Sequence, residues 1–263
     1  MKNETERKLF PEERRRAIEA LVAENGRISV DELTARFDVS KVTIRNDLDK
    51  LEHNGVIRRT HGGAMALAAD LSRADPEFYE RERVTLNEKL RIGAAGAALV
   101  EDGMTVLFDA STTSLQVAKR IKDRRNLTVL TNCLPLAMEV ASASTINTLV
   151  LGGNVRASSW AVVGPWAIEQ LTKVNVDLVF VGCKGITADE GLTDVNTFLV
   201  ETKRAMVSSS RRVVVVADHS KWGLVAFAAF AGIRDIEMII SGVDAPAAEV
   251  GRIQALGAQV MLV

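Results

Sequence analysis

The 263-residue sequence predicts two domains of different class, a small all-α domain followed by a larger α/β domain. Three observations predict this division. The chain is longer than a typical single domain. Its first 64 residues contain three short helical patterns and a glycine-turn hairpin. Beyond residue 86, apolar strand-like runs alternate with helical stretches, which is typical of a mostly parallel sheet with helices on both faces.

Composition sets limits on where the protein acts. The formal net charge is −1, so a nucleic-acid surface would have to be a local concentration of Lys and Arg. Cys133 and Cys183 lie far apart in apolar surroundings, which favours buried thiols over a disulfide or a metal site. No targeting segment and no apolar run of about 18 residues is present, so we expect a cytoplasmic protein without a membrane partner.

The small domain, residues 10–64, begins with a helical stripe of apolar residues between Pro11 and Glu24, with Arg14, Arg15 and Arg16 expected outside it. Asn25-Gly26 should end this helix. A second helix is predicted at Val30–Phe37. Ser40 is a good N-cap for a third helix, which ends near residues 53–55 and whose expected inward residues are Val42, Ile44, Leu48 and Leu51. Residues 56–64 predict a β-hairpin, which completes a winged helix-turn-helix.

The third helix occupies the position that enters the major groove in a helix-turn-helix. Arg45 and Asn46 can make bidentate contacts to guanine and adenine. An ordinary solvated helix face is the alternative, and the basic residues of the hairpin favour DNA binding over it. The predicted DNA-binding residues are Ser40, Lys41, Thr43, Arg45, Asn46, Arg58, Arg59, His61, Gly62 and Gly63.

Residues 65–86 change in character and predict a linker that is partly helical, followed by an α/β domain over residues 87–263. Strands are expected at residues 105–108, 127–130, 148–151, 177–181, 213–217, 237–240 and 259–262. Helices are expected at residues 87–100, 112–122, 133–142, 164–173, 197–210 and 245–256.

Polar and glycine residues follow several of these strands, at the edge where α/β sheets bind ligands. Asp109–Thr113 open a helix and could hold a phosphate, although capping alone is the more common use of such residues. Thr131-Asn132 and Gly152-Gly153 end the next two strands. A fourth strand ends in Gly182–Ile186. It is followed by Asp189–Thr193, which we expect to be a mobile loop able to cover a ligand.

Two long segments resemble the DeoR family of regulators. ISVDELTARFDVSKVTIRNDLDKLEHNGVIRRTHGGA is similar to its DNA-binding module, and FDASTTS, LTVLTN, LVLGGNVR, FVGCKGI, GLTD, ETKRAM and ADHSKWG are similar to its sensor domain. The sequence departs from the family pattern at Asn46, where a second Arg is usual, at Ser111, where Gly is usual, and at Leu199, where an acidic residue is usual. These departures bear on base preference and on the identity of the effector.

The resemblance implies a repressor of a carbohydrate operon that binds double-stranded operator DNA, with a ribose-5-phosphate-isomerase-like sensor for a phosphorylated sugar. It implies this effector shell: Asp109, Ser111, Thr112, Thr113, Asn132, Gly152, Gly153, Lys184, Lys203 and Lys221. We expect a homo-oligomer, a dimer or a tetramer, because one winged helix buries little DNA-contact surface.

Two other functions are alternatives to this one. A sugar-phosphate isomerase-like enzyme with an attached DNA module is the main alternative, since Asp109 or Asp189 could act as an acid or base. No Walker loop, metal-spaced His/Cys cluster or nucleophile elbow supports it. The sequence therefore predicts no catalytic residue, metal or cofactor. A purely architectural DNA-binding protein would not explain the second domain.

Overall fold

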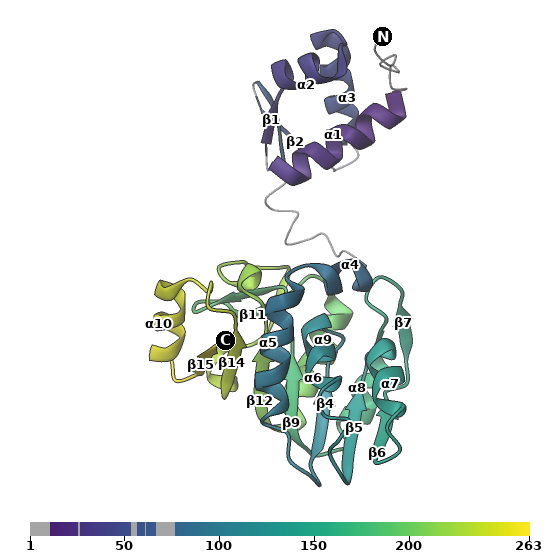
Figure 1. Cartoon of the computed structure of the whole chain (residues 1–263), viewed down its shortest axis with the longest axis vertical. Coiled ribbons are helices and arrows are strands. Elements are labelled where there is room, and N and C mark those ends of the chain that lie inside the picture. The colour runs from purple at the N-terminus through teal and green to yellow at the C-terminus, as the bar shows by residue number, and fades with distance from the viewer. Residues whose placement is uncertain (1–10, 26, 54–56, 61, 67–76) are drawn as a thin grey trace, which may run out of the picture. The chain divides into compact units, whose positions relative to one another are not determined.

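The computed structural model describes residues 11–25, 27–53, 57–60, 62–66 and 77–263. The chain divides into two compact units, Met1–Leu71 and Ser72–Val263 (Figure 1). No helix in these described ranges is long and apolar enough to cross a membrane.

The described part of the first unit is a winged helix-turn-helix, as predicted. Its core is formed by fully buried Ile18, Leu33, Ile44 and Leu48. A three-residue strand that the sequence analysis did not predict joins the hairpin, giving a sheet in the order β1-β3-β2 within the described residues. The elements are α1 (Pro11–Asn25), β1 (Arg27–Ser29), α2 (Val30–Phe37), α3 (Lys41–His53), β2 (Ile57–Thr60) and β3 (Gly63–Ala66).

Two side chains in this unit face the opposite way from the prediction. Arg14 is buried rather than outside the apolar stripe, because its Nε lies 2.6 Å from the carboxylate of buried Asp47 on α3. Val42, expected in the core, is 64% exposed, because α3 buries Ile44, Leu48 and Leu51 instead.

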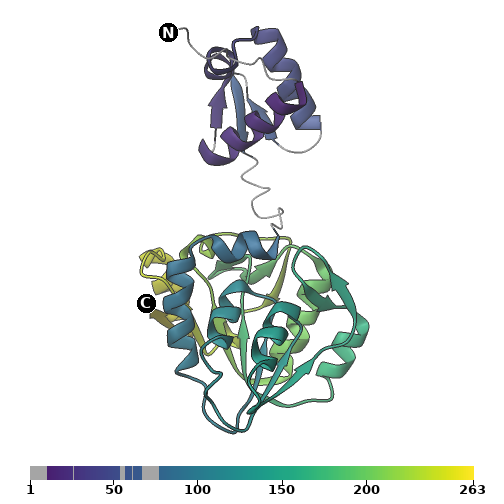
Figure 2. The same ribbon diagram turned by 45° about the vertical axis from the view of Figure 1, so that its right-hand side comes forward.

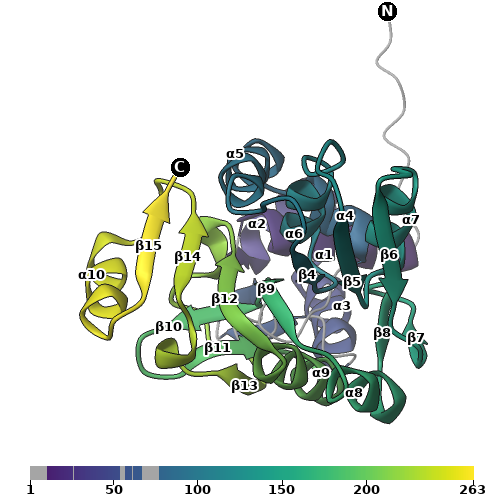
Figure 3. The ribbon, with the colours of Figure 1, turned by 90° about the horizontal axis from the view of Figure 1, so that it is seen from below.

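The second unit contains a parallel sheet of seven strands within residues 77–263, in the order β15-β14-β12-β9-β4-β5-β6 (Figure 3). This confirms the predicted α/β class. The strands are β4 (Thr105–Phe108), β5 (Leu127–Thr131), β6 (Ile146–Val150), β9 (Val176–Val181), β12 (Ser210–Val216), β14 (Met238–Ser241) and β15 (Gln259–Leu262).

Helices cover both faces of this sheet, because successive strand residues point to opposite sides. Phe108 and Phe180 stack at 5.3 Å in the core beneath α5 (Leu86–Ala97), α6 (Thr112–Ala118) and α7 (Leu134–Ala141). Leu107 and Val179 belong to the core beneath α8 (Pro165–Leu171), α9 (Thr197–Ser208) and α10 (Ala247–Ala255). Figure 3 shows α5 and α6 on one side of the sheet and α8 and α9 on the other.

Small antiparallel sheets lie beyond the main one. β7 (Asn154–Arg156) pairs with β8 (Ala161–Val163), and β11 (Gly191–Asp194) pairs with both β10 (Gly185–Thr187) and β13 (Ala228–Ala231). The prediction of a mobile loop at residues 189–193 was wrong, because residues 191–193 belong to β11. Ile186 and Leu192 are fully buried in this sheet, and the pairing with β13 joins residues more than 30 positions apart.

Short helices complete the fold. α4 (Phe78–Arg83) and the first residue of α5 fall inside the predicted linker, which was expected to be partly helical. Two 3₁₀ turns, η1 (His219–Lys221) and η2 (Ile233–Asp235), follow β12 and β13.

The close contact of α5 with α6 gives a first prediction. A Cβ at Gly93 would lie 2.7 Å from the backbone of Gln116, so Gly93→Ala should destabilise the second unit by about 1–3 kcal/mol. At Gly251 in α10 nothing lies within 4 Å, so Gly251→Ala should stabilise it by about 0.5–1 kcal/mol. Urea unfolding measures both; equal effects of the two substitutions would contradict this packing.

Candidate functional site

The start of α3 presents a polar face to solvent. Ser40 caps the helix, since its Oγ accepts a hydrogen bond from the Thr43 backbone N–H at 3.2 Å. Arg45 and Asn46 are exposed in the next turn. Lys41 forms an exposed ion pair with Asp31 at 2.7 Å. Exposed Val42 adds an apolar patch beside these groups, which suits contact with a thymine methyl group.

The predicted wing residues have structural contacts of their own. The Arg59 backbone N–H donates to Glu52 at 2.8 Å, and its guanidinium pairs with Asp49 on α3. Gly62 accepts a backbone hydrogen bond from Val30 at 2.9 Å. A Cβ at Gly63 would lie 2.1 Å from the Ile28 carbonyl oxygen, so this glycine is required where β1 meets β3. His61 and the side chain of Arg58 lie outside the described residues.

A second polar site lies where the strand order of the sheet reverses. From β4 the chain proceeds outward through β5 and β6, and from β9 it proceeds the other way through β12, β14 and β15. The carboxyl ends of β4 and β9 are therefore a topological switch point, where open α/β sheets bind ligands. Asp109 and Gly182 follow these two strands directly.

A buried ion cluster holds this switch point together. The Lys203 ammonium lies 2.6 Å from Asp194 and 3.1 Å from Asp109, and it donates to the Gly182 carbonyl at 2.8 Å. Burial alone would lower the pKa of Lys203, but the two carboxylates outweigh it and raise the pKa. Burial likewise opposes ionisation of Asp194, yet Lys203 holds the pKa of Asp194 below its ordinary value. Both partners are therefore charged.

Asp109 is fully buried and its carboxylate is occupied by the protein. One oxygen accepts from the Ser114 hydroxyl at 2.7 Å, and the other accepts from the Gly182 N–H at 2.9 Å. The Lys203 ammonium is likewise occupied, because it contacts the carboxylates of Asp109 and Asp194 and donates to the Gly182 carbonyl. Both residues thus have a positioning role that sequence reasoning did not anticipate.

The hydroxyl residues of α6 differ in their roles. Ser111 is the N-cap, and its Oγ accepts from the backbone N–H groups of Thr113 and Ser114 at 3.1 and 3.3 Å. This is the capping alternative raised from the sequence. Thr112 and Thr113 are each 4% exposed in the first turn, next to the switch point.

The next two strand ends support the β7–β8 hairpin. The Asn132 amide donates to the Val162 carbonyl at 3.1 Å, while its Oδ1 is buried without a hydrogen-bond partner among the described residues. The Gly152 N–H donates to Gln170 at 3.0 Å. Gly153 has φ +151°, and a Cβ there would lie 2.7 Å from the Val163 carbonyl.

The remaining predicted residues lie on either side of β9. Lys184 is half-buried, and its backbone N–H donates to Thr193 at 2.9 Å in the β10–β11 hairpin. Lys221 is half-buried in η1. Burial raises the pKa of Cys133 to about 12 and that of partly buried Cys183 as well, so both thiols are neutral; neither forms a disulfide.

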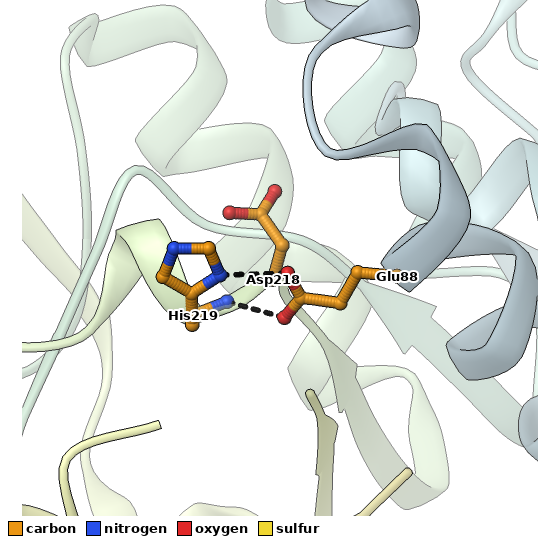
Figure 4. Close-up of side chains that lie close together, drawn as sticks. All are labelled: Glu88, Asp218 and His219. Atoms are coloured by element: carbon orange, nitrogen blue, oxygen red, sulfur yellow. Dashed lines mark hydrogen bonds and ion pairs between the residues drawn. The ribbon is translucent and has the colours of Figure 1, made fainter. Parts of the chain in front are cut away.

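Sequence reasoning missed Glu88 on α5. Its buried carboxylate accepts from the backbone N–H and Nδ1 of His219 at 2.6 and 2.7 Å and from the Gly242 N–H at 3.1 Å (Figure 4). Hydrogen bonding to Glu88 raises the pKa of His219. Glu88, His219 and Asp218 place ligand atoms within 4.8 Å of one another. No sequence signal marked Glu88, because an acidic residue early in a helix is normally solvated.

A winged helix-turn-helix joined to a parallel sheet with a polar switch point defines a DNA-binding regulator with a ligand-sensing domain. Residues 14–69 match the DeoR-like helix-turn-helix domain, and residues 84–243 match the DeoR C terminal sensor domain. The chain belongs to the DeoR family of transcriptional regulators.

Individual relatives agree with this assignment. The chain is 35% identical to the HTH-type transcriptional regulator GolR of Listeria innocua, over 89% of this chain and 91% of that protein. It is 31% identical to the glycerol-3-phosphate regulon repressor of Escherichia coli, again over 89% and 91%. Among solved structures, ribose 5-phosphate isomerase from Plasmodium falciparum aligns over 51% of each chain at 15% identity, with a TM-score of 0.37.

The ion cluster gives a second prediction. Lys203→Met leaves two buried carboxylates without their cation and should destabilise the sensor unit by about 3–5 kcal/mol at pH 7. In the native protein, the contribution of Asp194 is present above its ordinary pKa of 3.8 and is lost as the pH falls through the lower folded value. In the variant, burial still opposes ionisation of Asp194 and Lys203 no longer offsets it, so the pKa of Asp194 should lie above 3.8. The buried carboxyl should then take up a proton as the pH falls from 7 toward 4, and the deficit should shrink.

Urea unfolding at pH 7 and pH 4 measures the difference. Lys173→Met, which removes an exposed ion pair with Glu169, is the matched control and should change little. A deficit for Lys203→Met that is small or independent of pH would contradict the cluster.

Proposed function

We propose that this protein is a repressor of a carbohydrate-metabolism operon, controlled by a phosphorylated sugar. The capped start of α3, with Arg45 and Asn46 exposed on it, is the observation that carries the DNA-binding half of the proposal. One relative named as a glycerol-3-phosphate regulon repressor and another named as an aga operon repressor support the repressor assignment.

The sensing half rests on the switch point and on the sensor-domain match. We assign direct effector contacts to Thr112, Thr113, Asn132, Lys184 and Lys221. The other predicted shell members position these groups: Asp109, Ser111, Gly152, Gly153 and Lys203. The unpaired Oδ1 of buried Asn132 suits a sugar hydroxyl as its hydrogen-bond donor.

The proposal includes the partners predicted from the sequence. Double-stranded operator DNA is bound by a homo-oligomer in the cytoplasm, because useful affinity requires at least two winged helices on repeated half-sites. The switch point binds its ligand as a signal and does not turn it over. This agrees with relatives that are named as regulators.

The third prediction tests the DNA-reading surface. Arg45→Ala should weaken binding to DNA selected by the wild-type protein from a random pool by about 5- to 150-fold per half-site, the loss of one bidentate base contact. Circular dichroism should be unchanged because Arg45 is exposed. Arg234→Ala, an exposed arginine of the sensor unit, is the control. If the Arg45→Ala variant retarded the selected DNA in a gel shift as strongly as the wild-type protein does, α3 would not be the recognition helix.

A further inference from the structure

Val42 is an apolar side chain that the first unit leaves in solvent. Among the large apolar side chains described for this unit, it alone is exposed, at 64%. The other large apolar side chains of α3, Ile44, Leu48 and Leu51, are buried in the core. α3 packs against α2 and β2, and the helices of this unit lie beside its small sheet (Figure 2). Val42 therefore contributes little to the packing that holds α3 in place.

Val42 begins a continuous exposed face of α3. Residues three, four and seven positions apart lie on one side of a helix, and Arg45, Asn46 and Asp49 are exposed at these spacings. Leu48, on the other side, is fully buried. An apolar, a cationic and an amide side chain thus lie in the first two turns of the helix. This is the end of a recognition helix that contacts base edges.

Polar groups that flank this face are engaged within the protein. The hydroxyl oxygens of Ser40 and Thr43 lie 2.9 Å apart, and Ser40 also caps the helix. Lys41 pairs with a carboxylate of α2 at 2.7 Å. Farther along the helix, Asp49 pairs with Arg59 of β2. The side chains between these two ion pairs are therefore the ones best placed to read bases.

The three side chains of this face differ in the base that each recognises. In the major groove, arginine binds guanine and asparagine binds adenine, each through two hydrogen bonds. An apolar side chain instead contacts the C5-methyl group of thymine. Because a valine side chain has neither a hydrogen-bond donor nor an acceptor, thymine is the base that Val42 can select.

Helix geometry sets the distance between these bases. An α-helix rises 1.5 Å per residue, so Val42 and Asn46 are about 6 Å apart along its axis. Successive base pairs are about 3.4 Å apart. In the major groove, these two residues therefore span about two base-pair steps. The bases that the exposed face reads should lie within about three consecutive base pairs.

We propose that Val42 is a specificity-determining residue that packs against a thymine methyl group in each operator half-site. Asn46 reads an adenine and Arg45 a guanine within about three base pairs of the same half-site. The inference rests on the proposed function and names the bases that α3 recognises. The sequence pattern placed Val42 in the core, so its exposure in the structure is what reveals this role.

Deoxyuridine tests the thymine contact, because it differs from thymidine only in lacking the C5-methyl group. The full wild-type chain first selects DNA from a random pool, and each thymine of one half-site is then replaced singly. Fluorescence anisotropy should show that one replacement weakens binding by about fourfold, the loss expected when a methyl group is no longer buried.

The Val42→Ser variant assigns that methyl contact to Val42. It should bind the thymine and deoxyuridine forms of the site equally, because its shorter, polar side chain does not pack against the methyl group. Circular dichroism should be unchanged, since Val42 is exposed. Val243→Ser is the matched control: Val243 is 62% exposed in the second unit, so this variant should keep the wild-type discrimination.

A second selection tests the spacing. Selection with Asn46→Ala should lose the preference for adenine at one position, within about two base-pair steps of the sensitive thymine. Loss of this preference at a more distant position would contradict the assignment of both bases to one exposed face.

The outcomes separate this inference from the proposed function. If the wild-type protein selects a specific site but tolerates every deoxyuridine replacement, or if Val42→Ser keeps the discrimination, the thymine assignment is wrong and the proposed function stands. A selected half-site that contains no thymine would have the same meaning. If the wild-type protein selects no sequence from the pool, the proposed function is removed together with this inference.

Discussion

The ligand-sensing half of this protein depends on one buried interaction, the Lys203 ammonium between Asp109 and Asp194. Lys203 lies on α9, Asp109 follows β4 and Asp194 lies on β11. One buried ammonium therefore connects three elements that are far apart in the sequence. The Gly182 N–H and the Ser114 hydroxyl bind the same Asp109 carboxylate, which fixes the turn after β9 and the start of α6. Removing one member leaves a buried charge without its partner, which is strongly destabilising.

Two adjacent residues of α5, Glu88 and Lys89, connect this helix to other elements of the second unit. Glu88 binds the loops after β12 and β14 through His219 and Gly242, while Lys89 holds the last carbonyls of α4. Lys89 therefore joins α4 to α5, and Glu88 joins α5 to the loops after β12 and β14. A ligand can shift DNA affinity only through contacts that differ between two states of the protein.

Local sequence patterns predicted most of the fold. The helix at Val30–Phe37 and the strands at Thr105–Phe108 and Gln259–Leu262 match to the residue, because their periodicity and caps are local signals. Tertiary context determined what was missed. β11 and β13 are short strands that pair with each other across more than 30 positions of the sequence. Arg14 is buried only because Asp47 of another helix meets it. At the site, residue types indicated a polar edge, but not that Lys203 is occupied by carboxylates or that Glu88 and Lys89 face inward. Such roles depend on neighbours far apart in sequence.

Reciprocal coupling tests the central claim, that one sugar phosphate controls DNA binding through this site. Fluorescence anisotropy of labelled operator DNA, titrated with and without a sugar phosphate that binds the protein, gives the factor by which the ligand changes DNA affinity. Calorimetry of the same ligand, with and without DNA, gives the reverse factor. The account predicts that the two factors are equal and differ from one, in the range of about 5- to 150-fold. A sugar phosphate that binds tightly to the sensor unit, while both factors equal one, would contradict it.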